Sequence, residues 1–267
     1  MTEVSAQRQQ DRRATNSAFL KEVVSDIPGW LYDFTASCAM ELLDLQEESG
    51  WNGSLLEIGV YAGRFCSILA RDAFCRGSRL LGIDPFTHFG VEEVRSRLQS
   101  LKSSLTELAG DPDPEAGGSI MLVEDLSGNW TADRLLASLG GSARFIHIDA
   151  SHDRADVLWD LHICDAALAP TGIIAVDDWL NPQCLGVMEA TFQFFQQQPR
   201  ASVPFALTPG KLLLCGRANA VSYQQRLVEF ATTDQTFPQS ESFRQRSSMK
   251  NSGTKQPLFG SEILVLW

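Results

Sequence analysis

Four side chains in two short segments have the types and spacing of a site that binds a metal ion and moves a proton. Asp149 and His152 lie in the segment FIHIDASH, and Asp177 and Asp178 lie in the segment AVDDW. The separation of Asp149 and Asp177 is 177 − 149 = 28 residues, one strand–helix–strand repeat. Neighbouring strands of a parallel sheet lie about 4.8 Å apart. We therefore expect Asp149, Asp177 and Asp178 to reach one ion.

The donor atoms indicate the class of ion. Three carboxylates, with no cysteine and at most one histidine beside them, favour a hard cation, Mg²⁺ or Mn²⁺, over zinc. Without a cation the carboxylates would repel one another and raise one another's pKa values. The alternative is that Asp177 and Asp178 only cap the loop before Trp179.

His152 is the predicted general base. It follows Asp149 by three residues, beyond the end of the predicted strand, so its ring can lie over a metal without binding it. A bound metal lowers the pKa of a hydroxyl, and a positioned base contributes about 10²–10⁴-fold in rate. The alternative is that His152 caps a helix beginning near Asp153. His147, inside the strand, is predicted to be a core residue with satisfied polar atoms.

The elements that would position these residues follow a βαβ pattern. Apolar runs of strand length alternate with segments of helical period, as in a parallel sheet covered by helices. Strands are predicted at 55–58, 79–84, 119–125, 143–149 and 172–179, and helices at 65–74, 91–109, 153–168 and 184–198. An antiparallel pair at 203–207 and 211–215, a helix near 221–232, a linker at 246–256 and an apolar end at 261–267 follow. The segment 111–118 reads as a loop, and APTG (169–172) as a helix break.

The predicted fold class is α/β: a Rossmann-like, doubly wound, mostly parallel sheet with closing antiparallel strands, an N-terminal helical cap and a C-terminal extension. Residues 1–28 form a polar lead-in, 29–216 the main domain, and 217–267 an extension packed on the same domain.

Acidic residues stand at the carboxyl ends of the five predicted strands, where ligands of such sheets bind. They are Glu57, Asp84, Asp125, Asp149, and Asp177 with Asp178. One acid at a strand end is a common turn former, but five consecutive strands with an acid there predict a binding site.

The turn Gly59–Gly63 resembles, in part, the glycine-rich turns that bring a ligand to a helix N-terminus. Tyr61 stands where dinucleotide-binding turns have their second glycine, so it excludes a diphosphate but can flank a smaller ligand. Asp84 is placed to accept hydrogen bonds from both hydroxyls of a ribose, and Asp125 from an adenine amino group. Ordinary turn chemistry is the alternative for each.

Together, Glu57, Gly59, Gly63, Asp84 and the segments IDASH and VDDW resemble class I S-adenosylmethionine-dependent methyltransferases. More narrowly, they resemble the metal-dependent O-methyltransferases that act on sugars of macrolides and related natural products. The likeness covers about residues 28–216.

The resemblance implies a set of roles. Glu57 belongs to the cofactor-binding turn, Gly59, Tyr61 and Gly63 contact the methionine part of S-adenosylmethionine, Asp84 its ribose and Asp125 its adenine end. Asp149, Asp177 and Asp178 bind a divalent metal, Mg²⁺ or Mn²⁺, and His152 is the base. Two departures from the family pattern are Tyr61 and the pair Phe65–Cys66, which replaces small hydroxyl residues and weakens the expected contact to the cofactor's carboxylate.

The charge and the composition of the chain exclude some classes of binding partner. The net charge is 22 − 33 = −11, which disfavours nucleic acid and anionic membranes as partners. No apolar run approaches the ~18 residues of a membrane helix, the N-terminus lacks a signal-peptide pattern, and six cysteines without a CxxC pair indicate reduced thiols in a cytoplasmic protein. We expect a small-molecule acceptor, walled by Trp179 and by Trp30 with Leu31, and the apolar end SEILVLW is a candidate contact in a homo-oligomer.

Two rival functions remain open. A nicotinamide-dependent oxidoreductase would use the same architecture, but Tyr61 counts against it. A cofactor-binding module without catalysis is the other, and the complete set of acids with His152 counts against it.

Overall fold

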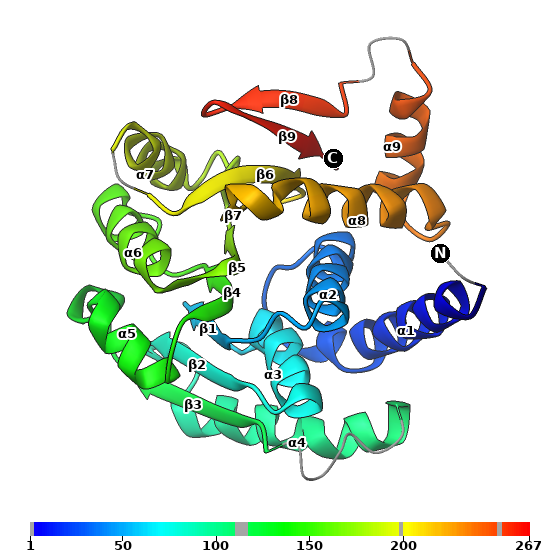
Figure 1. The fold of residues 1–267 in the computed structure, drawn as a ribbon. Helices are drawn as coiled ribbons and strands as arrows, with labels where there is room; N and C mark the ends of the chain where they lie inside the picture. The colour runs from blue at the N-terminus through cyan, green and yellow to red at the C-terminus, as the bar shows by residue number, and fades with distance from the viewer. Residues whose placement is uncertain (1–2, 110–116, 198–199, 250–252) are drawn as a thin grey trace.

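The computed structural model describes residues 3–109, 117–197, 200–249 and 253–267. Within them the strands form one mixed sheet in the order β3-β2-β1-β4-β5-β7-β6-β9-β8 (Figure 1). The strands are β1 Ser54–Ile58, β2 Arg79–Asp84, β3 Ser119–Glu124, β4 Ala143–Ile148, β5 Leu168–Val176, β6 Ser202–Thr208, β7 Lys211–Gly216, β8 Lys255–Leu258 and β9 Ser261–Val265. The predicted α/β class, with a mostly parallel sheet closed by antiparallel strands, is confirmed.

The strand order reverses at β1, which lies between β2 and β4. From β3 to β5 all neighbours are parallel, and β7 then runs antiparallel to both β5 and β6. The register aligns Glu57 of β1 with His147 of β4 and Ala175 of β5. The carboxyl ends of β1, β4 and β5 therefore meet at one edge, where this sheet type binds its ligands.

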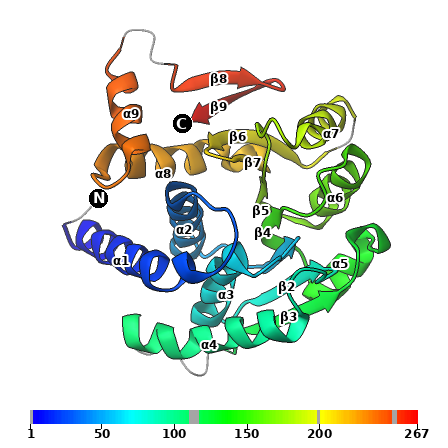
Figure 2. The ribbon, with the colours of Figure 1, turned by 180° about the vertical axis from the view of Figure 1, so that it is seen from behind.

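Helices cover both faces of the sheet. They are α1 Glu3–Glu22, α2 Asp33–Glu48, α3 Arg64–Arg76, α4 Val91–Ala109, α5 Ala132–Leu139, α6 Arg154–Ala167, α7 Leu185–Gln196, α8 Ala220–Thr233 and α9 Pro238–Ser247. One core cluster lies between the sheet and α2, α3, α4 and α8. The other lies between the sheet and α5, α6 and α7 (Figures 1 and 2). The expected N-terminal helical cap is present as α1 and α2.

Several details differ from the sequence analysis. The helix α5, between β3 and β4, was not predicted, although the hydroxyl of Thr131 accepts a hydrogen bond from the Arg134 amide at its start and Gly140 ends it. The strand β5 begins at Leu168, directly after α6, so the APTG segment ends the helix as predicted but continues as strand. The helix α9 was not predicted either, and it ends at Ser247, inside the start of the predicted linker. Most of the predicted loop 111–118 lies outside the described residues.

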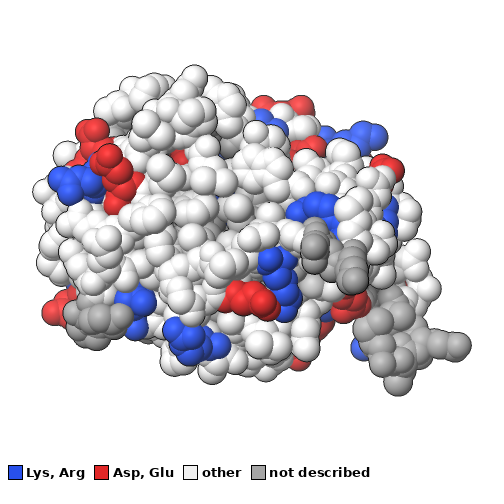
Figure 3. Space-filling model, turned by 90° about the horizontal axis from the view of Figure 1, so that it is seen from above, with Lys and Arg blue, Asp and Glu red and all other residues white. Residues whose placement is uncertain are grey.

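The C-terminal extension is part of the sheet. β9 pairs in parallel with β6 and antiparallel with β8, so the apolar end forms an inner strand and β8 the edge. Ile263, Leu264 and Leu266 are buried there. Among the described helices, none combines the length and apolarity needed to cross a membrane. Figure 3 shows the molecule from above relative to Figure 1, and on that face the charged side chains lie in small separate groups around a broad uncharged area.

Candidate active site

A cavity of about 390 Å³ opens at the carboxyl ends of β1, β4 and β5. Its lining comes from the turn after β1, from the loop before α2, from the ends of β4 and β5, and from the turn between β6 and β7. Trp30 and Leu31 line the cavity as expected, whereas Trp179 is buried outside the lining. The cavity lining includes Glu57, Gly59, Tyr61, His147, Asp149, His152, Asp177, Asp178 and Lys211.

The turn after β1 is built around glycine. Gly59 has φ +87°, and a Cβ atom there would lie 2.0 Å from the carbonyl oxygen of Asp149. Only glycine allows this approach, so the turn and the loop that carries Asp149 are in direct backbone contact. Gly63 also has a positive φ and caps the start of α3. The Tyr61 ring contacts two loops, with its centroid 6.1 Å from that of Trp30 before α2 and 4.9 Å from that of Phe89 before α4.

Asp84 supports this turn from β2. Its Oδ2 accepts hydrogen bonds from the amides of Val60 at 2.8 Å and Tyr61 at 2.9 Å, and its Oδ1 accepts one from Phe86 at 2.5 Å. Asp84 is not among the residues that line the cavity. The structure therefore gives Asp84 a part in positioning the turn, and its contact with a ribose stays a prediction.

Asp125 is likewise engaged by its own loop and lies outside the cavity lining. Its oxygens accept hydrogen bonds from Leu126, Asn129 and the Trp130 indole at 2.7–3.0 Å, and Arg134 forms an ion pair at 3.1 Å. The hydrogen bond from Asn129 is the largest cause that lowers the pKa of Asp125. Its predicted contact with an adenine also stays a prediction.

A buried chain of polar groups runs behind the cavity. Nδ1 of His147 lies 2.8 Å from Oε1 of Glu57, and Nζ of Lys211 donates to Nε2 of His147 at 2.8 Å. Lys211 also forms an ion pair with Asp177. This confirms His147 as a satisfied core residue. Lys211 was missed; the only signal was a lysine opening the apolar run LLLC directly after a TPG turn.

Asp149 and Asp177 lie close together, as the repeat spacing predicted. Their carboxylate oxygens and a His147 ring nitrogen all lie within 4.8 Å of one another. Burial, followed by repulsion from Asp177, raises the pKa of Asp149 well above its usual range. Burial is the largest single effect on Asp177 and opposes its ionisation, but Lys211 and His147 together outweigh burial and lower the pKa of Asp177.

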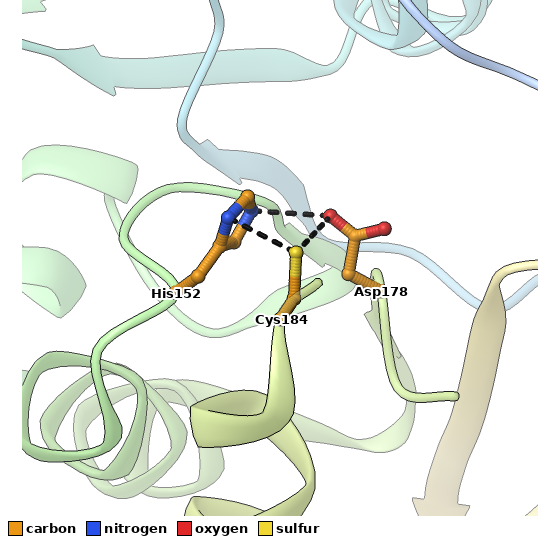
Figure 4. A group of neighbouring side chains, drawn as sticks. All are labelled: His152, Asp178 and Cys184. Carbon is orange, nitrogen blue, oxygen red and sulfur yellow. Dashed lines mark hydrogen bonds and ion pairs between the residues drawn. The ribbon is translucent and has the colours of Figure 1, made fainter. Parts of the chain in front are cut away.

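Asp178 points to a second group, drawn in Figure 4. Its Oδ2 lies 3.1 Å from Nε2 of His152 and 3.6 Å from Sγ of Cys184, and Sγ lies 3.2 Å from Nδ1 of His152. These donor atoms again fall within 4.8 Å of one another. Asp153 is the N-cap residue of α6, so the ring of His152 is engaged by the site. Cys184 was also missed as a site residue.

The charges of the lining indicate which ligands fit. Glu57, Asp149, Asp177 and Asp178 oppose Arg64 and Lys211, so the formal charge is 2 − 4 = −2 with neutral histidines. This balance suits cationic ligands, and the paired oxygens of Asp149 and Asp177 are donors of the kind that Mg²⁺ and Mn²⁺ prefer. A divalent ion therefore fits these residues chemically, although Lys211 already faces Asp177.

Comparisons with known proteins agree with the fold. Residues 56–179 match the family described as "Methyltransferase domain". Two structures of CalS11, a TDP-rhamnose 3'-O-methyltransferase of calicheamicin biosynthesis, superpose with TM-scores of 0.51 and 0.53 at 18% and 16% identity, covering 76% and 77% of this chain and 93% and 92% of theirs. The O-methyltransferase NovP superposes with a TM-score of 0.52 at 13% identity, over 66% of this chain and 77% of its own. No curated protein sequence matches the chain.

The match over residues 56–179 spans β1 to the end of β5, and so includes the glycine turn, Asp149, His152, Asp177 and Asp178. The likeness to CalS11 and NovP shows a shared fold, and the family match places a methyltransferase domain over the strands that carry these residues.

Proposed function

We propose that the protein transfers the methyl group of S-adenosylmethionine to a hydroxyl of a small molecule, with His152 as the general base. One observation carries this proposal: a single cavity is lined both by the Gly59 turn and by the aspartates with His152. A cofactor held by the turn and an acceptor held by the acids would therefore meet in one cavity. CalS11 methylates a TDP-linked sugar, and a sugar-bearing molecule is the acceptor class that we propose here.

The chemical step is an in-line displacement. The acceptor oxygen attacks the methyl carbon, the carbon–sulfur bond breaks with its electron pair going to sulfur, and S-adenosylhomocysteine leaves. The hydroxyl proton goes to His152, whose side chain is 46% exposed beside the cavity. Asp178, 3.1 Å from Nε2, orients the ring and stabilises the imidazolium that forms.

A divalent metal would be held by Asp149 and Asp177, and when bound it would lower the pKa of the acceptor hydroxyl. Asp178 would join that ligand set only after turning away from His152 and Cys184. Asp149 has a further part: it lies against the backbone of the Gly59 turn, so it links the acceptor side of the cavity to the cofactor side.

The test combines binding and turnover. S-adenosylmethionine binding is measured by calorimetry, and methyl transfer to TDP-sugars and glycosides by mass spectrometry, with Mg²⁺ and with chelator. We expect Asp149→Asn and His152→Gln to lose about 10²-fold or more in rate, while Asp133→Asn and His162→Gln, away from the cavity, retain activity.

The rivals give different results. If a nicotinamide cofactor binds and S-adenosylmethionine does not, the oxidoreductase function replaces this proposal. If S-adenosylmethionine binds but no acceptor is methylated under any metal condition, the protein is a cofactor-binding module. Tyr61 stands where a dinucleotide-binding turn has its second glycine, and its ring is held by contacts with Trp30 and Phe89, which counts against a diphosphate and favours the methyl donor.

A further inference from the structure

We propose that His152, Asp178 and Cys184 form a second metal site, specific for a borderline transition-metal ion of the zinc class. Its effect on catalysis rests on the proposed function, because an ion bound there takes His152 away from proton transfer. The site is separate from the Asp149 and Asp177 pair and differs from it in chemistry.

The donor set carries the first part of the argument. One imidazole nitrogen, one thiol sulfur and one carboxylate oxygen suit zinc or cobalt, whereas Mg²⁺ requires oxygen ligands. The three residues come from three places in the fold: the loop before α6, the turn after β5 and the N-cap position of α7. Figure 4 shows their side chains pointing toward one another from these segments.

The spacing of the donors carries the second part. Tetrahedral zinc sites have bonds of about 2.0–2.3 Å, which places their ligand atoms roughly 3.3–3.8 Å apart. Here Nδ1 to Sγ is 3.2 Å, Nε2 to Oδ2 is 3.1 Å and Sγ to Oδ2 is 3.6 Å. The two short distances involve different ring nitrogens, but one His152 nitrogen, Sγ of Cys184 and a carboxylate oxygen of Asp178 all lie within 4.8 Å of one another, so one nitrogen has to approach both partners when an ion binds. Cys184 would bind as a thiolate, with its proton released to solvent.

The surroundings hold the three residues in place. Nδ2 of Asn181 donates to Oδ1 of Asp178 at 2.8 Å, and the Cys184 amide donates to the carbonyl of Asn181 at 3.0 Å. A Cβ atom on Gly186 would lie 2.3 Å from the carbonyl oxygen of His152, so the start of α7 packs directly on the loop that carries His152. Such outer contacts orient ligands in metal sites and commonly raise affinity 10–100-fold.

The position of the site gives its consequence. His152 and Asp178 line the cavity, so an ion bound to them would lie at the space proposed for the acceptor. An occupied site leaves the acceptor hydroxyl without its base. Zinc would therefore inhibit methyl transfer, whereas Mg²⁺ would not. The inhibition would arise because zinc binds the His152 nitrogen that has to accept the proton of the acceptor hydroxyl.

The test is a titration of the whole protein with Co²⁺, because a cobalt–thiolate bond gives a charge-transfer absorption band that oxygen ligands do not give. We expect one equivalent of Co²⁺ to produce the band and Zn²⁺ to abolish it. Cys184→Ser should remove the band. Cys75→Ser, at the exposed cysteine, and Asp149→Asn should retain it.

A second variant guards against a folding defect in Cys184→Ser. His152 is partly exposed, and His152→Gln should lower the Co²⁺ affinity by more than the 10–100-fold typical of an outer-shell change. The site is refuted if no band forms or if the band survives Cys184→Ser, and loss of the band with Cys75→Ser would assign it to the other thiol.

Inhibition is measured separately. Zn²⁺ should slow methyl transfer by the parent protein and have a smaller effect on Cys184→Ser, each relative to its own metal-free rate. If no methyl transfer is found under any condition, the proposed function fails, and the cobalt band still decides whether the site exists. If the band forms while Zn²⁺ leaves transfer unchanged, the inhibitory part of the proposal is wrong.

Discussion

Removing the positive charge of Lys211 should destabilise the protein strongly. Lys211 is 2% exposed, contacts His147 at 2.8 Å and forms an ion pair with Asp177, whose side chain is 12% exposed. The variant Lys211→Met keeps most of the side-chain volume but leaves Asp177 buried beside Asp149 without a cation. Breaking a buried ion pair in this way costs about 3–5 kcal/mol, because the remaining charge keeps its desolvation penalty.

The magnitude can be checked by unfolding. For a protein of this size, each kcal/mol shifts Tm by about 2–4 °C, so Lys211→Met should melt about 6–20 °C below the parent. Denaturant unfolding should show the same loss in free energy. The control is Lys255→Met, which breaks an exposed ion pair with Glu262 at 2.8 Å and should cost about 0–1 kcal/mol.

A double variant separates the charge effect from lost packing. Lys211→Met with Asp177→Asn removes both charges, and replacing a whole buried pair is often close to neutral, so most of the stability should return. Mg²⁺ should also raise the Tm of Lys211→Met more than that of the parent, because a bound ion would replace the missing ammonium. The reasoning is wrong if Lys211→Met costs no more than Lys255→Met, or if the double variant is no more stable than the single one.

Three further predictions address pH, the glycine turn and the cavity entrance. Burial raises the pKa of Asp160 to about 7, above the ~3.9 of the unfolded chain. The parent protein therefore loses stability as pH rises from about 4 to 7 and Asp160 ionises. Asp160→Asn should be more stable than the parent at pH 8, by up to about 4 kcal/mol, but not at pH 4. Urea unfolding that gives both proteins the same dependence of unfolding free energy on pH would contradict this prediction. Gly59→Ala, whose Cβ would meet the Asp149 carbonyl at 2.0 Å, should lower turnover about 10²-fold, whereas Gly90→Ala, with open space around it, should not. The side chain of Trp30 is 87% exposed at the cavity, so Trp30→Ala should raise the acceptor KM about 2- to 12-fold and leave Tm unchanged. A lower Tm in Trp30→Ala would indicate a structural role instead.

The parallel half of the sheet was predictable because its signals are local. An apolar strand that ends in an acid can be read from a few consecutive residues. The same holds for the apolar stripe of α4, whose members are buried: Val94, Leu98, Leu101 and Leu105. The helix α5 was not recognised because it has eight residues, too few for a clear helical period. The place of β9 between β6 and β8 could not be read because it depends on pairing between distant segments.

The same distinction explains the candidate site. The separation of Asp149 and Asp177 follows from β4 and β5 being neighbours, and the structure brings the two carboxylates together. Lys211 reaches them through β7, which pairs Leu212 with Val176 of β5. That pairing places Lys211 beside Asp177, and no local pattern in the sequence reveals it.

Asp177 and Asp178 diverge for a reason that chain geometry supplies. Successive side chains at the end of an extended strand point to opposite sides, and Asp178 then takes a positive φ of +56°. Asp177 therefore turns inward to Lys211, while Asp178 turns to His152 and Cys184. Adjacent acids in a sequence need not serve one ion. Here the turn divides them between a pair of carboxylates that a hard cation would prefer and a nitrogen–sulfur–oxygen group that includes the proposed base.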